Sequence, residues 1–253
     1  MGLDVYAGTL TRYYARNWKT IVQQWGEANG YQVNVVRSSA DGGETASPEV
    51  ILQAVTGWRD QLIGQLGGSL KKKPLWKEDN DATPYYTDKP DWSALHALML
   101  YVICKVNGQE VPVTVPKSFG LLGTTVYDEF MKKNPSISLM QCDCWWLPFG
   151  EDFMFRYILP TGQEHMFATV GKLKEELRQI NAIEWNADEE TIIGWRDAEG
   201  YPEGIVMGAD KKVKTMNDPD RYNTVSLAKF AFSILWQAVK HSEQHGTLII
   251  FDY

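Results

Sequence analysis

The stretch TVSLAKFAFSILWQAVKHSEQHGTLIIFDY, residues 224–253, decides the fold. Apolar residues cover more than one side of a helix from about Thr224 to His245, which predicts that this helix is largely buried. Gly246 suits the left-handed conformation that ends many helices. Thr247–Phe251 is β-branched and apolar, as expected of a strand inside a sheet. A buried helix that leads directly into a core strand predicts α/β or α+β layering.

The start of the chain also has the composition of a strand. Leu3–Tyr14 is rich in residues that favour β-structure and predicts a strand that bends at Gly8. We therefore expect one mixed β-sheet that includes both an N-terminal and a C-terminal strand, packed by several amphipathic helices. The length of 253 residues and the 44% hydrophobic content are sufficient for one globular domain, residues 1–253, with a sizeable core.

Apolar residues at helical spacing predict the helices between these ends. The clearest start is Ser47-Pro48-Glu49, which offers an N-cap, a proline at the first helical position and an acid in the first turn. Asn107-Gly108 has two interpretations. It either ends a helix that begins at Asp91, which the apolar spacing favours, or forms the turn of a hairpin. The predicted helices are Trp18–Ala28, 47–66, Asp91–Lys105, Thr124–Lys132 and one from Val170 to about Ile180.

Shorter strands and irregular segments fill the rest of the chain. In the helix that begins at Val170, the charged residues Lys174, Glu175, Glu176 and Arg178 are expected on the solvent side. Residues 69–90 contain three prolines and no periodicity, which predicts a long irregular excursion. Residues 186–220 are polar and glycine-rich, as in turns and short strands. The predicted strands are Tyr31–Val36, Val111–Val115, Ile137–Trp146 and Phe153–Leu159.

Composition restricts the possible partners and the compartment. The 32 acidic and 25 basic residues give a formal charge of −7, which disfavours binding to nucleic acid or to an anionic membrane and favours a basic protein partner. No apolar stretch approaches the roughly 20 residues of a membrane span. The three cysteines form no closed disulfide set and no secretion signal is visible, so the sequence predicts a cytoplasmic protein.

One aromatic and acidic segment is a candidate binding site. Trp145, Trp146 and Phe149 lie close to Glu151 and Asp152. Adjacent strand residues face opposite sides, so one tryptophan is exposed unless both faces of the sheet are covered. An exposed tryptophan beside acidic residues is typical of a protein-binding hot spot. The alternative interpretation is a tryptophan-rich core strand.

The histidines offer the main signals for enzymatic chemistry. His241 and His245 are four residues apart on a helix and could chelate a metal together, although the HExxH signature is absent. Their alternative role is to stabilise the carboxyl end of that helix. His96 and His165 have no evident partner. Phosphate loops, dinucleotide fingerprints and nucleophile elbows are absent, so no cofactor is predicted.

Two stretches resemble a known group of bacterial proteins. Asp91-Trp92-Ser93-Ala94-Leu95-His96-Ala97-Leu98 is similar to the Trp-x-x-Leu-His-x-Leu helix of the YfbM-like domains, and the helix, turn and closing strand before Tyr253 are similar to theirs as well. The resemblance implies a bacterial α/β or α+β domain without an assigned activity, and it supplies no catalytic residues.

These observations favour one hypothesis over a second, and the sequence does not separate the first from a third. The first is a non-enzymatic protein-binding module of the cytoplasm, of the immunity or antitoxin kind, that neutralises a basic bacterial toxin. The second is a hydrolase whose site combines His96, His165 or the His241/His245 pair with loop carboxylates. A phage or structural component is the third. The sequence does not indicate an oligomeric state.

Overall fold

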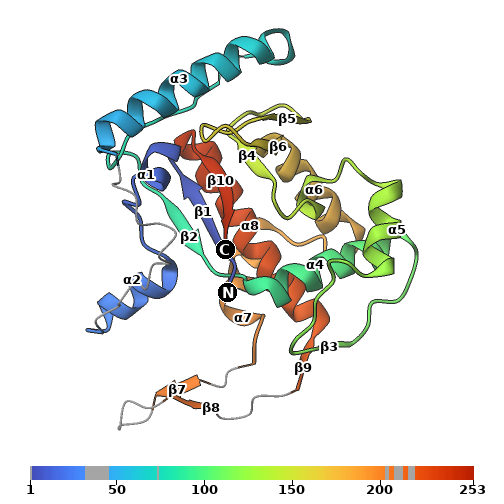
Figure 1. Ribbon diagram of the computed structural model, residues 1–253. Coiled ribbons are helices and arrows are strands. Elements are labelled where there is room, and N and C mark those ends of the chain that lie inside the picture. Colours follow the sequence, from blue (N-terminus) through green and yellow to red (C-terminus); the bar gives the residue numbers. More distant parts are fainter. Residues whose placement is uncertain (1, 32–45, 73, 203–204, 208–212, 216–219) are drawn as a thin grey trace.

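The computed structural model describes residues 2–31, 46–72, 74–202, 205–207, 213–215 and 220–253 (Figure 1). A mixed six-stranded sheet lies at the centre, in the order β2-β1-β10-β4-β6-β5. β4 and β6 pair in parallel, and the other neighbours pair antiparallel. The predicted mixed sheet is therefore confirmed. Its strands are β1 (Asp4–Gly8), β2 (Tyr86–Asp88), β4 (Trp145–Leu147), β5 (Met154–Ile158), β6 (Glu164–Thr169) and β10 (Leu248–Asp252).

The two ends of the chain pair side by side in this sheet, as predicted. β1 and β10 are in register from Asp4 opposite Asp252 to Gly8 opposite Leu248. Helix α8 (Thr224–His245) precedes β10 and ends at Gly246, whose φ of 66° is left-handed. A Cβ atom at Gly246 would also collide with the carbonyl oxygen of Leu75, so both the conformation and the close approach require glycine.

The predicted strand Leu3–Tyr14 is wrong beyond Gly8, because helix α1 (Leu10–Tyr14) begins there. Thr9 caps this helix by accepting a hydrogen bond from the Arg12 N–H. The carboxylate of Glu78 accepts from the N–H groups of Leu10 and Thr11 at 3.2 and 2.8 Å. The β-favouring composition is overridden by a cap and by an acid that lies far away in the sequence.

Four helices cover one side of the sheet, which we call the helical face. They are α4 (Asp91–Val106), α6 (Val170–Ile183), α7 (Glu189–Ala198) and α8. Figure 1 shows α4 and α8 side by side, and these two helices make extensive contact. Alternate strand residues point into this layer, among them Trp146, Ala168, Ile249 and Phe251.

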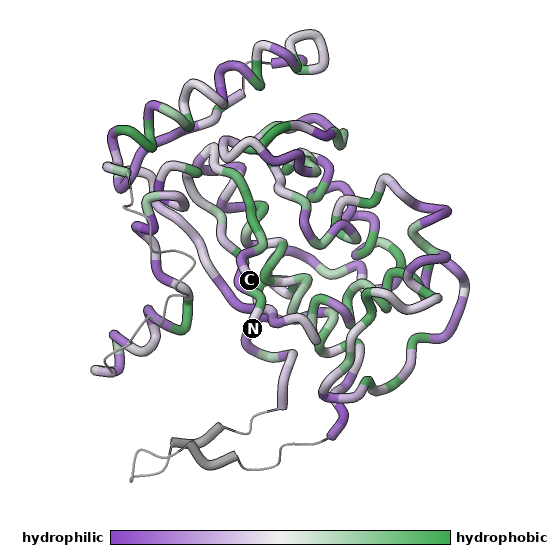
Figure 2. Tube along the Cα trace, in the orientation of Figure 1, coloured by the Kyte–Doolittle hydropathy of each residue, from purple (hydrophilic) through white to green (hydrophobic). Residues whose placement is uncertain are grey.

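The opposite side, the aromatic face, has a thinner cover. It consists of α1, the long helix α3 (Pro48–Leu66) and the segment around Trp76. Only Val55 and Leu62 of α3 are fully buried. In Figure 2, hydrophobic and hydrophilic positions alternate along α3, whereas β10 is largely hydrophobic. The strand residues that point to this side include Trp145, Leu147, Phe167, Leu248 and Ile250.

Smaller elements surround these layers. β3 (Thr114–Pro116) pairs with β9 (Arg221–Asn223), and β7 (Ile205–Met207) pairs with β8 (Val213–Thr215). The remaining elements are the helices α2 (Ile21–Ala28) and α5 (Thr125–Lys133) and the short 3₁₀ turns Gly67–Ser69 and Ser138–Met140. No helix of the described residues combines the length and apolar character that crossing a membrane requires.

Most predicted helices are confirmed, and several strands are not. α3 begins after the Ser47 cap, and α4 runs unbroken to Val106, so the hairpin interpretation of Asn107-Gly108 is wrong. The predicted strand Ile137–Trp146 is mainly irregular, because a 3₁₀ turn occupies Ser138–Met140. Strands β2 and β6 and helix α7 were not predicted, and the expectation of an irregular segment over 69–90 is wrong at Tyr86–Asp88, which pairs with β1. The predicted strand Tyr31–Val36 lies almost entirely outside the described residues.

Candidate functional site

The aromatic segment lies in the core. Trp145, Trp146 and Phe149 are 8%, 0% and 2% exposed. Trp145 points to the aromatic face, where it packs edge-on against His165 at 5.2 Å between ring centroids. Trp146 points to the helical face and packs against Phe251 at 5.0 Å. Both faces of the sheet are covered, so the expectation of an exposed tryptophan is wrong and the core-strand interpretation is correct.

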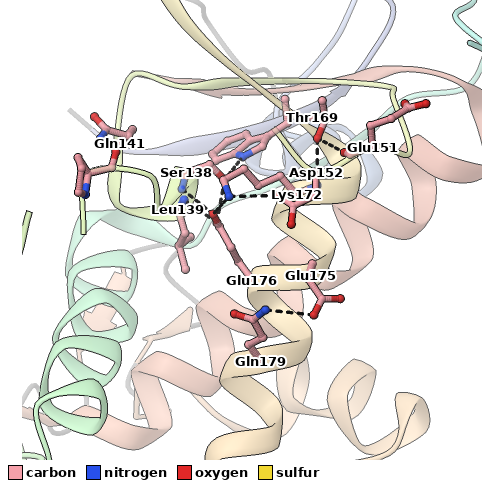
Figure 3. A network of polar contacts seen from close by, with 12 residues as sticks. Ser138, Leu139, Gln141, Glu151, Asp152, Thr169, Lys172, Glu175, Glu176 and Gln179 are labelled. Atoms are coloured by element: carbon pink, nitrogen blue, oxygen red, sulfur yellow. Dashed lines mark hydrogen bonds and ion pairs between the residues drawn. The ribbon is translucent and has the colours of Figure 1, made fainter. Parts of the chain in front are cut away.

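The two acidic residues of that segment bind other parts of this chain (Figure 3). The Glu151 carboxylate accepts a hydrogen bond from the Lys71 N–H at 2.8 Å, and its carbonyl accepts from the Thr169 hydroxyl. Asp152 forms an ion pair with Lys172 at 3.1 Å. Glu151 and Asp152 therefore hold the β4–β5 loop in place, and they form no surface with Trp145 or Trp146.

Glu176 was expected on the solvent side of α6, and the structure buries it. Its carboxylate accepts hydrogen bonds from the N–H and hydroxyl of Ser138, both at 2.7 Å, and from the Leu139 N–H at 2.9 Å (Figure 3). The Trp146 indole N–H donates to the same Ser138 hydroxyl at 2.8 Å. Burial raises the pKa of Glu176, and these hydrogen bonds and Lys172 oppose the shift. The network joins α6, the 3₁₀ turn and β4, which is a structural role.

Of the four histidines, only His241 and His245 contact each other in the described part of the chain. Nδ1 of His96 lies 3.5 Å from the Phe119 carbonyl oxygen, and Nε2 of His241 lies 3.1 Å from that of Pro84. Burial lowers the pKa of His96, His165 and His241. The rings of His241 and His245 lie close together, with centroids 4.5 Å apart and planes tilted by 43°. In the described part of the chain, no three His, Cys, Asp or Glu side chains lie close enough to hold a metal ion.

One cavity lies at the carboxyl end of α8. It measures about 450 Å³ and is lined by residues of the 71–75 segment, the 148–151 loop and the α8 terminus. The first N–H groups of α6 beside it are already bonded, since Gly171 donates to the Phe149 carbonyl and Lys172 to the Thr169 hydroxyl. The cavity therefore has Lys71 and Lys72 in its lining, and the N–H groups of Gly171 and Lys172 are not free to bind a ligand there.

The outer edge of β5 offers unpaired backbone groups. The Phe153 carbonyl accepts from the Thr169 N–H at 3.2 Å, and the Leu159 N–H donates to the Gln163 carbonyl at 2.7 Å. Because bonding alternates along an antiparallel strand, the N–H and C=O groups of Met154, Arg156 and Ile158 point away from β6. Figure 1 shows β5 at the margin of the sheet.

Among the described residues, nothing bonds the outward groups of Met154 and Arg156. At the third outward position the Ile158 carbonyl accepts from the Trp58 indole N–H at 2.7 Å. This contact confirms the direction in which the Ile158 backbone points. Four main-chain hydrogen-bonding groups, two donors and two acceptors, are therefore available in a row.

A groove of about 640 Å³ continues from this edge, between α3 and the end of β5. None of its lining residues is charged. Trp58 and Tyr157 contribute aromatic rings, and α3 contributes three glutamines, Gln53, Gln61 and Gln65. This surface was not predicted, although the spacing of the glutamines on one helix face is visible in the sequence.

No protein-family model, curated protein or solved structure matches this chain. The geometry alone therefore supports a functional assignment.

Proposed function

We propose that this chain is a non-enzymatic protein-binding module of the cytoplasm, of the immunity or antitoxin kind, which binds an extended segment of a basic partner as a seventh strand beside β5. The observation that carries the proposal is the free outer edge of Met154 and Arg156. Donors and acceptors that alternate at strand spacing are complementary to the main chain of another extended polypeptide.

The other edge of the sheet differs from β5. β2 is three residues long, and its Thr87 and Asp88 are each 5% exposed. Asp88 is bound by Arg196 of α7 at 2.9 Å. Proteins commonly shorten or cover edge strands in this way to prevent unwanted pairing. The contrast supports β5 as the edge that is kept available.

A second copy of this chain is a poorer occupant than a different protein. Antiparallel pairing of two β5 strands about their centre would place Arg156 opposite Arg156, and like charges in directly opposed positions are destabilising. The net charge of −7 favours attraction of a basic protein instead.

The test compares three forms of the chain as bait in a lysate of the source organism. Arg156→Pro removes the outward N–H without removing a hydrogen bond to β6. Arg156→Gln keeps that N–H and removes only the charge and the exposed ion pair with Glu164. We expect one basic protein to be retained by the wild type and by Arg156→Gln, and to be lost with Arg156→Pro.

Thermal unfolding must first show that the three forms are folded alike. If Arg156→Pro unfolds early, Met154→Pro at the first residue of the strand replaces it. Equal retention by the proline variant and the wild type would overturn strand addition at β5, as would the retention of no protein by any form.

A further inference from the structure

Trp58 fixes where an added strand must end. Its indole N–H occupies the Ile158 carbonyl, which the main chain of a partner would otherwise use. A seventh strand can therefore pair with Met154 and Arg156 and must then leave the edge. The groove between α3 and residues 157–162 begins at this position.

We infer that the partner segment turns into this groove and is recognised there by its uncharged, hydrogen-bonding side chains, such as those of Asn, Gln, Ser or Thr. This inference rests on the proposed function. The proposed function requires only that the main chain of the partner segment pairs with β5. The inference adds that the residues next to this paired strand have uncharged, hydrogen-bonding side chains.

The chemistry of the groove supports an uncharged occupant. Gln53, Gln61 and Gln65 are exposed, and their amides have no hydrogen-bond partner among the described residues. Each amide offers donors and an acceptor, which match hydroxyl and amide groups. A charged side chain would lose water in this groove and meet no opposite charge in its lining, which is unfavourable.

A glycine keeps the groove open at the centre of the glutamine row. Gln53, Gly57, Gln61 and Gln65 follow one another every four residues and share one side of α3. A Cβ atom at Gly57 would have no neighbour within 4 Å. Packing within this chain therefore does not require glycine here, although glycine in a helix interior is unfavourable relative to alanine. Glycine at this position leaves the helix backbone open to a partner segment that lies in the groove.

Gly64 provides a matched control in the same helix. A Cβ atom there also meets nothing within 4 Å, and Gly64 does not line the groove. Gly57→Leu and Gly64→Leu thus make the same chemical change seven residues apart on the same side of α3, and of the two glycines only Gly57 belongs to the lining of the groove.

The probe is a library of random twelve-residue peptides displayed on phage and selected on the immobilised full chain. Synthetic copies of the enriched peptides are then titrated by fluorescence anisotropy against the wild type and the variants. In the enriched peptides, we expect uncharged polar residues at a constant distance from a stretch in which apolar and polar residues alternate, as in a strand. Gly57→Leu should weaken binding about tenfold or more, whereas Gly64→Leu should leave it within about twofold.

The outcomes separate this inference from the proposed function. If Arg156→Pro abolishes peptide binding and Gly57→Leu does not weaken it, the groove is not used and the inference is overturned, while strand addition stands. Enriched peptides with charged residues at the groove position would overturn it as well. If no enriched peptide is sensitive to Arg156→Pro, both fail. Equal melting temperatures of the two leucine variants exclude a folding artefact.

Discussion

The two faces of the sheet are both closed to water, but they are closed in different ways. On the helical face, α4, α6, α7 and α8 form a layer in which whole sides of the helices are buried. On the aromatic face, α3 touches the core through few residues, and its outer side is exposed in the described part of the structure. A thin cover of this kind can bury the strands and still present a helix surface next to a sheet edge. We therefore assign stability mainly to the first face, and the binding proposed above to the second.

The neighbouring tryptophans of β4 give the largest test of this difference. Trp146→Ala should cost about 5 kcal/mol of unfolding free energy, because it leaves a cavity in the thick layer and removes the hydrogen bond to Ser138. Trp145→Ala should cost about 3 kcal/mol, since Trp145 packs against the partly exposed His165 and Tyr13. Urea unfolding followed by circular dichroism measures both.

Equal losses, or a larger loss at Trp145, would show that the aromatic face contributes as much stability as the helical face. If the alanine variants do not fold, Trp146→Phe and Trp145→Phe give the same comparison, and the order of the two effects should be unchanged.

The second test concerns Asp4. Its side chain is on the same side of β1 as that of Tyr6, which is the side of the aromatic face. Its Oδ1 is buried and has no hydrogen-bond partner in the described part of the chain. Burial, with the nearby carboxylates of Asp252 and Asp91, raises its pKa to about 6 against the opposing charge of Lys89. The folded state therefore holds this proton more tightly than the unfolded chain, so the contribution of Asp4 to stability falls as pH rises from about 4 to about 6.

Asp4→Asn should remove this dependence. Relative to the wild type, the variant should gain stability steadily across that pH interval and keep the gain at higher pH. The urea midpoint of both proteins, measured from pH 3.5 to 8, gives the difference directly. If the urea midpoints of the two proteins change in parallel with pH, Asp4 has an ordinary pKa in the folded protein and this prediction is wrong.

The smallest expected effect comes from replacing one glycine in each of two helices, one from each face of the sheet. Gly64→Ala in α3 and Gly194→Ala in α7 both replace a glycine whose added Cβ atom meets nothing within 4 Å. Each should raise the free energy of unfolding by about 1 kcal/mol, and thereby the melting temperature by roughly 2–4 °C. Differential scanning calorimetry can resolve such shifts. No gain at Gly64 alongside a gain at Gly194 would indicate that α3 is less firmly helical than α7.

Sequence signals within a helix or at its ends were sufficient to predict several elements of the fold. α8 follows from its apolar residues and from Gly246, and the start of α3 from Ser47 and Pro48. Helix α7 carries comparable signals, an Asp188 cap and the buried residues Ile192 and Trp195 at helical spacing, but it lies in a polar, glycine-rich segment whose composition predicts turns and short strands. Glu176 likewise lies on the same helix side as Leu173, Leu177 and Ile180, so its burial was predictable from position.

Long-range contacts explain the remaining errors. Both tryptophans of β4 are buried because α3, far away in the sequence, covers one face while α8 helps to cover the other. No local sequence pattern around β4 indicates that both faces of the sheet are covered. The candidate site depends on the same kind of information: the glutamines of α3 are visible in the sequence, but their position beside a free strand edge appears only after the chain has folded.

The place of β10 in the sheet also determines how the chain must fold. This strand lies between β1 and β4, so without it the sheet divides into β2–β1 and β4–β6–β5. Its partner β1 is separated from it by almost the whole chain, and such distant pairing makes folding slow. Before β10 inserts, the facing edges of both halves and the apolar side chains of Ile249 and Phe251 are open to other chains. A protein interrupted before Leu248 should therefore aggregate, and the closing step of the sheet is the point at which chaperones would act on this chain.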